Sequence, residues 1–371
     1  MNLNIIFKNK FKILTILLLI FFIFNQKEDF SSGPKKYKRC NEKKISGILN
    51  NIFSDNNISK TYSEDWDVYI PCGYNMIEQE LTKITPQNSN QLIFGVSGCD
   101  KIVSKNGIWN LLENKFGRKI ASAIMPETFV LSNPQHMNLF NKKFNKKNTY
   151  ILKKNIQRKK GLKLTNNLHE IQNSYKEGFK IVQEYKNNTF LIDDTKMNLR
   201  VYVLIICQYG NVDIYIHRQG KCLYAGKKYS KNNMDFDANI TDSYKMPDDV
   251  YKNKPESFED LKIYLTKNNY DANLLFKRID ILIQKIGLST EGNLCQLNKL
   301  KNNKTFQLFG VDIIFNDKMY PMLLELNKGP DMIAKNDKDS DMKRKIEVDM
   351  FQKVGLVEVR KINYKNEFYP V

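Results

Sequence analysis

The sequence predicts a mixed fold of the α/β or α+β class, and two observations indicate it. Short runs of β-branched and aromatic residues, typical of strands, alternate along the chain with segments whose apolar residues recur at helical spacing. The chain also has 371 residues, of which 42% are hydrophobic and 12% aromatic. That is enough for two or three packed units, and it excludes a wholly disordered protein.

The first element is a hydrophobic segment at the amino terminus. Residues 13–24 read ILTILLLIFFIF and follow a lysine-containing stretch. A helix of this length spans ~18 Å, less than the ~30 Å of a bilayer core, so residues 4–11 would have to lengthen it for it to cross a membrane. We expect residues 1–30 to form an uncleaved membrane anchor. A cleaved signal peptide and a buried or surface helix are the alternatives.

The remaining elements follow from local patterns in chain order. A polar stretch with a Ser-Ser-Gly-Pro breaker predicts a linker over residues 31–65. Apolar runs then predict strands at 93–96, 129–131, 150–153, 190–192, 197–207, 212–217, 306–315 and 320–327. Helical spacing predicts helices at 104–115, 171–182, 258–265, 272–286 and 342–354. We divide the folded part into units at 66–145, 146–195 and 196–371, with an Asn- and Lys-rich stretch at the first boundary.

The charge of the chain bears on its partners. The sequence holds 59 Lys and Arg against 40 Asp and Glu, a formal net charge of +19. Such a surface favours acidic partners, namely nucleic acid, anionic lipid or an acidic polypeptide. The alternative is that Lys and Asn are overused throughout the chain. No zinc-finger or RNP-like motif supports nucleic-acid binding, so we expect none.

The cysteines and histidines exclude some kinds of site. The chain has 6 Cys and 3 His, with no CxxC motif and no Cys/His cluster. A disulfide scaffold and a structural zinc site are therefore not expected, and chemistry that needs several His ligands is nearly excluded.

The sharpest local signal is the predicted hairpin near the carboxyl terminus. If residues 317–318 form a two-residue turn, Asp312 lies opposite Leu323, and Asp312, Glu325 and Asn327 fall on one face. Two carboxylates and an amide oxygen on otherwise apolar strands suit Mg²⁺. The alternative is the polar, solvent-facing side of an edge hairpin.

Two further segments carry cations in a strand pattern. Lys196, Asn198 and Arg200 line one face of a strand whose other face is apolar. Cations on a half-buried strand favour an anion such as a polyphosphate or a carboxylate, and an exposed amphipathic strand is the alternative. The second segment is a strand that ends at Lys153 and runs into a cationic loop up to Gly161. This loop could fold over phosphates, although most charge runs are simply solvated.

Seven motifs in order resemble those of one family, the tubulin–tyrosine ligase and tubulin–tyrosine ligase-like group of ATP-grasp ligases. The resemblance covers roughly residues 95–327. Its motifs are SGCDKIVSK (97–105), MPETFVL (125–131), YILKKNIQRKKG (150–161), VQEY (182–185), KMNLR (196–200), ANITD (238–242) and FGVDIIFNDKMYPMLLELN (309–327).

The resemblance implies an α+β ATP-grasp fold, an α/β sandwich. An amino-terminal α/β subdomain would occupy residues 66–145, preceded by the short hydrophobic helix. Central and carboxyl-terminal ATP-grasp subdomains would occupy 146–195 and 196–371, and the last would hold the metal site. In this family Lys153 and Lys196 would bind ATP phosphates, and the segment at Gln183 and Tyr185 would bind adenine.

The resemblance also assigns the reacting end of the site. Arg200 would face the γ-phosphate and the reacting carboxylate, as a catalytic residue together with Lys153. The remaining assigned residues are the Mg²⁺ ligands Asp312, Glu325 and Asn327, and the nucleotide-side residues Lys105 and Asn198.

Three positions depart from the family pattern. Asn198 stands where the family has Asp, and Lys154 stands where it has Pro. Leu223 stands where the family usually has Arg, and Lys221 or a lysine at 227–228 is a candidate to replace that charge. The last departure bears on the substrate more than on the ATP site.

The resemblance implies an ATP- and Mg²⁺-dependent ligase that forms amide bonds through an acylphosphate. Its substrates would be an acidic protein tail, such as that of tubulin, and free Tyr, Glu or Gly. We expect a monomer whose catalytic part faces the cytosol, held at the membrane by the amino-terminal segment or, without an anchor, cytoplasmic. The alternatives are an inactive, membrane-tethered binder of acidic polypeptides or microtubules, and an ATP-grasp ligase with a non-tubulin substrate.

Overall fold

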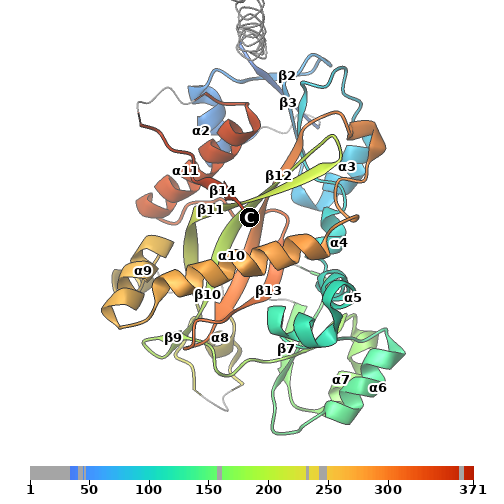
Figure 1. The fold of residues 1–371 in the computed structure, drawn as a ribbon, viewed down its shortest axis with the longest axis vertical. Coiled ribbons are helices and arrows are strands. Elements are labelled where there is room, and N and C mark those ends of the chain that lie inside the picture. Colours follow the sequence, from blue (N-terminus) through green and yellow to red (C-terminus); the bar gives the residue numbers. More distant parts are fainter. Residues whose placement is uncertain are drawn as a thin grey trace, which may run out of the picture. The chain divides into compact units, whose positions relative to one another are not determined.

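The computed structural model describes residues 34–40, 45, 47–156, 161–230, 234–241, 249–358 and 363–371. The chain from Lys36 to Val371 forms one compact unit with a mixed α/β fold (Figure 1). The predicted anchor at residues 1–30 lies outside the described residues. Among the described helices, none combines the length and hydrophobicity that crossing a membrane requires.

Ten of the described strands form one large mixed sheet. Their order is β14 (Phe368–Pro370), β11 (Asn211–Tyr224), β10 (Thr195–Gln208), β12 (Thr305–Phe315), β4 (Leu92–Phe94), β3 (Val68–Ile70), β1 (Lys36–Arg39) and β2 (Ser59–Thr61). In addition, β13 (Pro321–Asn327) pairs with β12, and β9 (Leu191–Ile192) pairs with β10. The long strand β10 pairs antiparallel with both β11 and β12, whereas β4 pairs with β12 in parallel.

Four of the described strands form a second, smaller antiparallel sheet. Their order is β5 (Thr128–Val130), β8 (Ile181–Glu184), β6 (Tyr150–Lys153) and β7 (Leu162–Thr165). The sequence-based division places β5 in the unit at 66–145, yet β5 pairs with β8 from the central unit.

The described helices pack around these sheets. The α-helices are α2 (Gly47–Asp55), α3 (Ile77–Lys83), α4 (Cys99–Val103), α5 (Lys105–Ile124), α6 (Pro134–Lys143), α7 (Leu168–Asn173), α8 (Phe236–Asn239), α9 (Phe258–Lys267), α10 (Ala272–Ser289) and α11 (Asp337–Val354). The 3₁₀ turns are η1 (Tyr74–Met76), η3 (Ser174–Glu177), η4 (Val250–Lys252) and η5 (Asn298–Leu300).

Strand β10 is a wall between two hydrophobic cores. Val201 and Val203 point into a core that also takes apolar residues of α5, α9 and α10. Tyr202 and Leu204 point the other way, into a core shared with α2 and α11. Successive side chains of a strand face opposite sides, so a fully apolar strand can serve two layers. Figure 1 shows α10 crossing one side of the sheet and α11 beside α2.

The prediction of a helix over residues 171–182 was wrong. The helix α7 ends at Asn173, and one 3₁₀ turn follows it up to Glu177. Gly178 then adopts a left-handed conformation with φ 88°, which ends the turn. Residues from Ile181 onward form strand β8, because their backbone pairs with β6.

The expected linker over residues 31–65 differs from the structure, which builds β1, α2 and β2 from it. The sequence analysis expects no disulfide scaffold, and the described residues contain two individual disulfides that it does not predict. Cys40 is joined to Cys72, and Cys207 to Cys295, with Cα–Cα separations of 5.4 and 5.9 Å. Sequence spacings of 32 and 88 residues carry no motif, and the pairing arises only once the fold brings these segments together.

Candidate active site

The hairpin of β12 and β13 brings Asp312, Glu325 and Asn327 to one face, but in a different register from the predicted one. Asp312 lies opposite Glu325 rather than Leu323. The loop at 316–320 moves the pairing by one residue, and a bulge after Asp312 moves it by another. A shift of one residue would turn the two carboxylates to opposite faces, and the second shift restores the common face.

These three side chains offer the ligand set that suits a magnesium ion. Asp312 and Glu325 are cross-strand neighbours, and Asn327 Nδ2 donates a hydrogen bond to Asp312 Oδ2 at 3.4 Å. Burial alone would raise the pKa of Glu325, but the positive charges of Lys105, Lys153 and Arg200 outweigh it and lower that pKa. Two acidic side chains and an amide that can present its oxygen fit the oxygen coordination that Mg²⁺ prefers.

Arg200 and Lys105 each form an ion pair with one of these two carboxylates. Arg200 grips Asp312 with two hydrogen bonds, one from Nε to Oδ1 and one from an Nη to Oδ2 at 3.0 Å. Lys105 Nζ lies 3.3 Å from Glu325 Oε2, and Ser104 caps α5 directly before it. Gly310 leaves room for the guanidinium stem, because a Cβ there would lie 2.9 Å from Arg200 Cδ.

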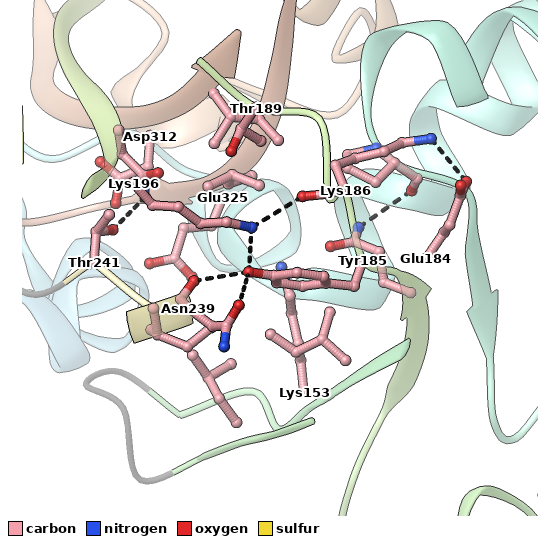
Figure 2. A pocket seen from close by; sticks show the side chains of 18 of the residues that line it. Lys153, Glu184, Tyr185, Lys186, Thr189, Lys196, Asn239, Thr241, Asp312 and Glu325 are labelled. Atoms are coloured by element: carbon pink, nitrogen blue, oxygen red, sulfur yellow. Dashed lines mark hydrogen bonds and ion pairs between the residues drawn. The ribbon is translucent and has the colours of Figure 1, made fainter. Parts of the chain in front are cut away.

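Lys196 is a buried lysine that has no acidic partner among the residues that the structure describes. Its side chain is 5% exposed, and its Nζ donates hydrogen bonds to Tyr185 Oη and, at 3.2 Å, to the backbone oxygen of Lys186 (Figure 2). Tyr185 Oη in turn donates to Asn239 Oδ1 at 2.7 Å. The burial of Lys196 lowers its pKa from 10.5 to about 7. Keeping a buried amino group charged costs free energy, and a bound anion would lower that cost.

Lys153, from the smaller sheet, is the second buried cation of the site. It is 5% exposed, and burial lowers its pKa to about 8, against the opposing effect of Glu325. Within the described residues, neither Lys153 nor Lys196 has an ion pair. Both face a cavity of about 130 Å³, with Asp312 and Glu325 on its wall. Figure 2 shows these four side chains around the same space.

The same cavity has an apolar part. It is lined by Ile151, Leu162, Met197, Ile314 and Leu324. This surface suits a flat aromatic base.

The polar residues predicted for the nucleotide lie on the same wall. Gln183 lines the cavity, but its amide is already engaged, donating to Thr128 Oγ1 at 2.7 Å. The same Nε2 also donates to the backbone oxygen of Pro126 at 3.3 Å. Asn198 also lines the cavity and donates to Thr241 Oγ1 at 2.5 Å.

A second, larger cavity of about 750 Å³ adjoins the first. The two share Asp312 and Glu325 as wall residues, and the larger one adds Lys105, Arg200 and Asn327. The site is thus a small pocket with buried lysines and a roomy one with an arginine, joined at a carboxylate pair.

Comparison with known proteins identifies the family. The sequence profile of the tubulin-tyrosine ligase family matches residues 84–363. The chain belongs to the tubulin-tyrosine ligase family. The family assignment made from seven motifs is therefore confirmed.

Several members of the tubulin-tyrosine ligase family are similar to this chain. Tubulin polyglutamylase TTLL5 of Mus musculus is 29% identical over 252 residues, which is 63% of this chain and 19% of the relative. The probable beta-tubulin polyglutamylase of Tetrahymena thermophila is 28% identical over 249 residues, 59% of this chain and 20% of the relative. Tubulin monoglutamylase TTLL4 of Mus musculus is 24% identical over 359 residues, which is 87% of this chain and 28% of the relative. The chain thus spans 19–28% of the length of these relatives.

The structure of this tubulin-tyrosine ligase family member brings every predicted site residue to one of the two cavities. The smaller one takes Lys153, Gln183, Tyr185, Lys196 and Asn198, the larger one takes Lys105, Arg200 and Asn327, and both share Asp312 and Glu325. Their assigned roles stay predictions.

Sequence reasoning missed three side chains at this site. Asn239 accepts a hydrogen bond from Tyr185, and Thr241 accepts one from Asn198. Both lie in the motif at 238–242, so the sequence held a signal for them. Glu347 lines the larger cavity from α11, and no motif marks it.

Proposed function

We propose that this chain is an ATP- and Mg²⁺-dependent ligase of the ATP-grasp type that joins an amino acid to a carboxylate of a protein tail. One observation carries the proposal. Two buried lysines, Lys153 and Lys196, face a carboxylate pair across a cavity with an apolar wall, and neither forms an ion pair with any described residue. A nucleotide offers all three matching parts, since its base is apolar, its phosphates are anionic and its metal ion takes oxygen ligands.

The chemistry asked of the site is the activation of a carboxylate. A carboxylate oxygen attacks the γ-phosphorus of ATP, the bond from that phosphorus to the bridging oxygen breaks, and ADP leaves with the electron pair. The amine nitrogen then attacks the carbonyl carbon of the acylphosphate, inorganic phosphate leaves, and the amine proton ends on phosphate or water. Both steps need positioning and charge neutralisation rather than a protein nucleophile.

The residues present divide this work between them. Lys153 and Lys196 would hold the phosphates, with the backbone at Gln183 beside the base. Arg200 would orient the reacting carboxylate from the larger cavity. Asp312, Glu325 and Asn327 would hold Mg²⁺, which neutralises charge on the phosphates when bound.

Charge supports an acidic protein tail as the acceptor. The chain carries a net charge of +19, which attracts a Glu-rich tail by long-range steering that salt weakens. Three relatives act on tubulin according to their names. We therefore propose a tubulin-type tail as the acceptor and Tyr, Glu or Gly as first candidates for the amine. If added salt left the affinity for a Glu-rich peptide unchanged, steering would be disproved.

The expected organisation belongs to the same proposal. Subdomains at 66–145, 146–195 and 196–371 would carry the site, and residues 1–30 would anchor it at a membrane with the catalytic part in the cytosol.

The decisive experiment measures nucleotide binding and then the product. We expect MgATP to raise the melting temperature of the purified chain, and Glu325→Gln and Lys196→Met to reduce that shift. Lys277→Met is the matched control, because this exposed lysine of α10 lies away from both cavities. Mass spectrometry of tubulin incubated with ATP and each amino acid then tests ligation. Binding of MgATP without any product would favour the inactive-binder alternative.

A further inference from the structure

Two tyrosine rings lie against the amino group of Lys196, and they come from different sheets. Lys196 Nζ lies over both rings, 4.0 Å from the ring centroid of Tyr185 and 4.1 Å from that of Tyr229. Tyr185 directly follows β8 of the smaller sheet, whereas Tyr229 lies in the loop after β11 of the large sheet. At such distances the negative face of an aromatic ring attracts an ammonium group. Tyr229 has no role in the proposed function.

Tyr229 is itself fixed on two sides. Its backbone N–H donates to the backbone oxygen of Asp194 at 2.7 Å, two residues before Lys196. Its hydroxyl donates to Asn187 Oδ1 at 3.3 Å, next to Lys186, whose backbone oxygen accepts a hydrogen bond from Lys196 Nζ. Tyr229 thus links the start of β10, which carries the lysine, to the segment after β8, which carries one of its acceptors.

An aromatic ring suits this lysine better than a carboxylate would. A carboxylate in contact with Lys196 would stabilise the ammonium form, but it would also compete with the phosphates that this lysine is proposed to bind. A ring stabilises the same charge without adding a competing anion. Within the described chain, Lys196 Nζ donates to Tyr185 Oη and to the backbone oxygen of Lys186. An ammonium group has three N–H donors, so one is left for an anion.

The other charged groups of this cavity do not replace the rings. Lys153, Asp312 and Glu325 line the same cavity as Lys196, and the two carboxylates already pair with other cations of the site. Burial lowers the pKa of Lys196 to about 7. Burial also raises the pKa of both tyrosine hydroxyls, so the rings stay neutral. The two rings therefore stabilise the ammonium form near neutral pH.

We propose that Tyr229 is a positioning residue that keeps Lys196 charged and oriented toward the phosphates of the nucleotide. The proposal rests on the proposed function and adds a residue to its site. Tyr229 acts through Lys196, because it is not among the described residues that line either cavity. A ring contact of this kind favours the charged form of an amine about fivefold.

Calorimetric titration of the full chain with Mg²⁺ and a non-hydrolysable ATP analogue tests this proposal. Tyr229→Leu should weaken binding about fivefold at pH 8, where Lys196 must take up a proton to bind phosphates, and by less than about twofold at pH 6, where it is already charged. Tyr229→Phe loses the bond to Asn187 but keeps the ring, so it should bind like the unmodified chain. Tyr62→Leu is the matched control, because it removes an exposed ring 4.8 Å from Lys60 Nζ.

A second measurement needs no nucleotide. In a chain labelled with ¹³C at the lysine Cε atoms, the resonance that Lys196→Met removes reports the titration of Lys196. Tyr229→Leu should lower the pKa that this resonance reports, and Tyr229→Phe should leave it unchanged. If the analogue does not bind to the unmodified chain, the proposed function fails, while this titration still decides the role of Tyr229.

Three outcomes overturn the proposal: Tyr229→Leu binds the analogue like the unmodified chain, it loses affinity equally at pH 6 and pH 8, or Tyr229→Phe loses as much as Tyr229→Leu. An equal loss at both pH values would be a structural defect that does not depend on the charge of Lys196. If Tyr229→Leu does not fold, pentafluorophenylalanine at position 229 takes its place, because it keeps the shape of the ring but not its negative face.

Discussion

Replacing Lys196 by Met should stabilise the ligand-free protein, and the gain should depend on pH. Lys196 is almost fully buried, and burial lowers its pKa from 10.5 to about 7. Each pH unit of such a difference corresponds to about 1.4 kcal/mol, which sets an upper limit of ~5 kcal/mol on the cost of keeping this lysine charged. The lost hydrogen bonds to Tyr185 and to the backbone of Lys186 offset part of that gain.

The sign of the pH dependence follows from proton binding. Between about pH 7 and 10.5 the unfolded chain holds the Lys196 proton and the folded chain does not, so the unfolding free energy of the unmodified protein rises with pH there. Met has no proton to release. The advantage of Lys196→Met should therefore be larger at pH 7 than at pH 9, by ~2 kcal/mol.

Urea unfolding at the two pH values, with Lys277→Met as the control, measures this difference. MgATP binding by the unmodified protein at pH 8 should also take up a proton, because phosphates restore the charge on Lys196. Calorimetry in two buffers of different ionisation enthalpy detects that uptake. A stability difference between Lys196→Met and the unmodified chain that is equal at both pH values would refute the burial argument.

Three further predictions concern stability. Asp312→Ala leaves the guanidinium of Arg200 buried and unpaired, so the unfolding free energy should fall by about 3–5 kcal/mol in urea titration, and an unchanged midpoint would contradict the ion pair. Gly310→Ala places a Cβ 2.9 Å from Arg200 Cδ, so we expect a loss of about 1–3 kcal/mol in the same assay together with weaker ligase activity, whereas activity at the unmodified level would show that Arg200 has room to move. Cys207→Ser opens the link to Cys295 across 88 residues and should lower stability by about 4 kcal/mol without reductant, an effect that must vanish when dithiothreitol is present in both samples.

The sequence predicted the site better than the register that builds it. Side-chain alternation placed Asp312, Glu325 and Asn327 on one face. The structure agrees because the two one-residue shifts, in the loop and at the bulge, add up to two residues, and a two-residue shift leaves each side chain on its predicted face. Neither shift has a clear sequence signal, so the predicted pairing of Asp312 with Leu323 was wrong although its consequence held. Strands such as Tyr150–Lys153 were found where apolar runs predict them.

The misses share a physical cause, which is that tertiary contacts decided the outcome. Residues 171–182 have helical spacing, yet Gly178 and pairing with β6 turn their second half into a strand. The partners of Cys40 and Cys207 are set by the fold alone. Glu347 has the sequence pattern of an ordinary helix residue, and only the fold places it on the wall of the larger cavity.

The position of β10 between the two cores has a consequence for how the protein melts. Val203 and its neighbour Leu204 belong to different cores, yet they share one backbone and one pairing with β12. Neither layer can come apart while that strand keeps its partners, so heat should disrupt both layers in a single transition. Amide hydrogens of β10 and β12 should then exchange with solvent only when the whole protein unfolds. Lys196 and Arg200 lie in the amino-terminal half of β10, so their backbone should be equally rigid.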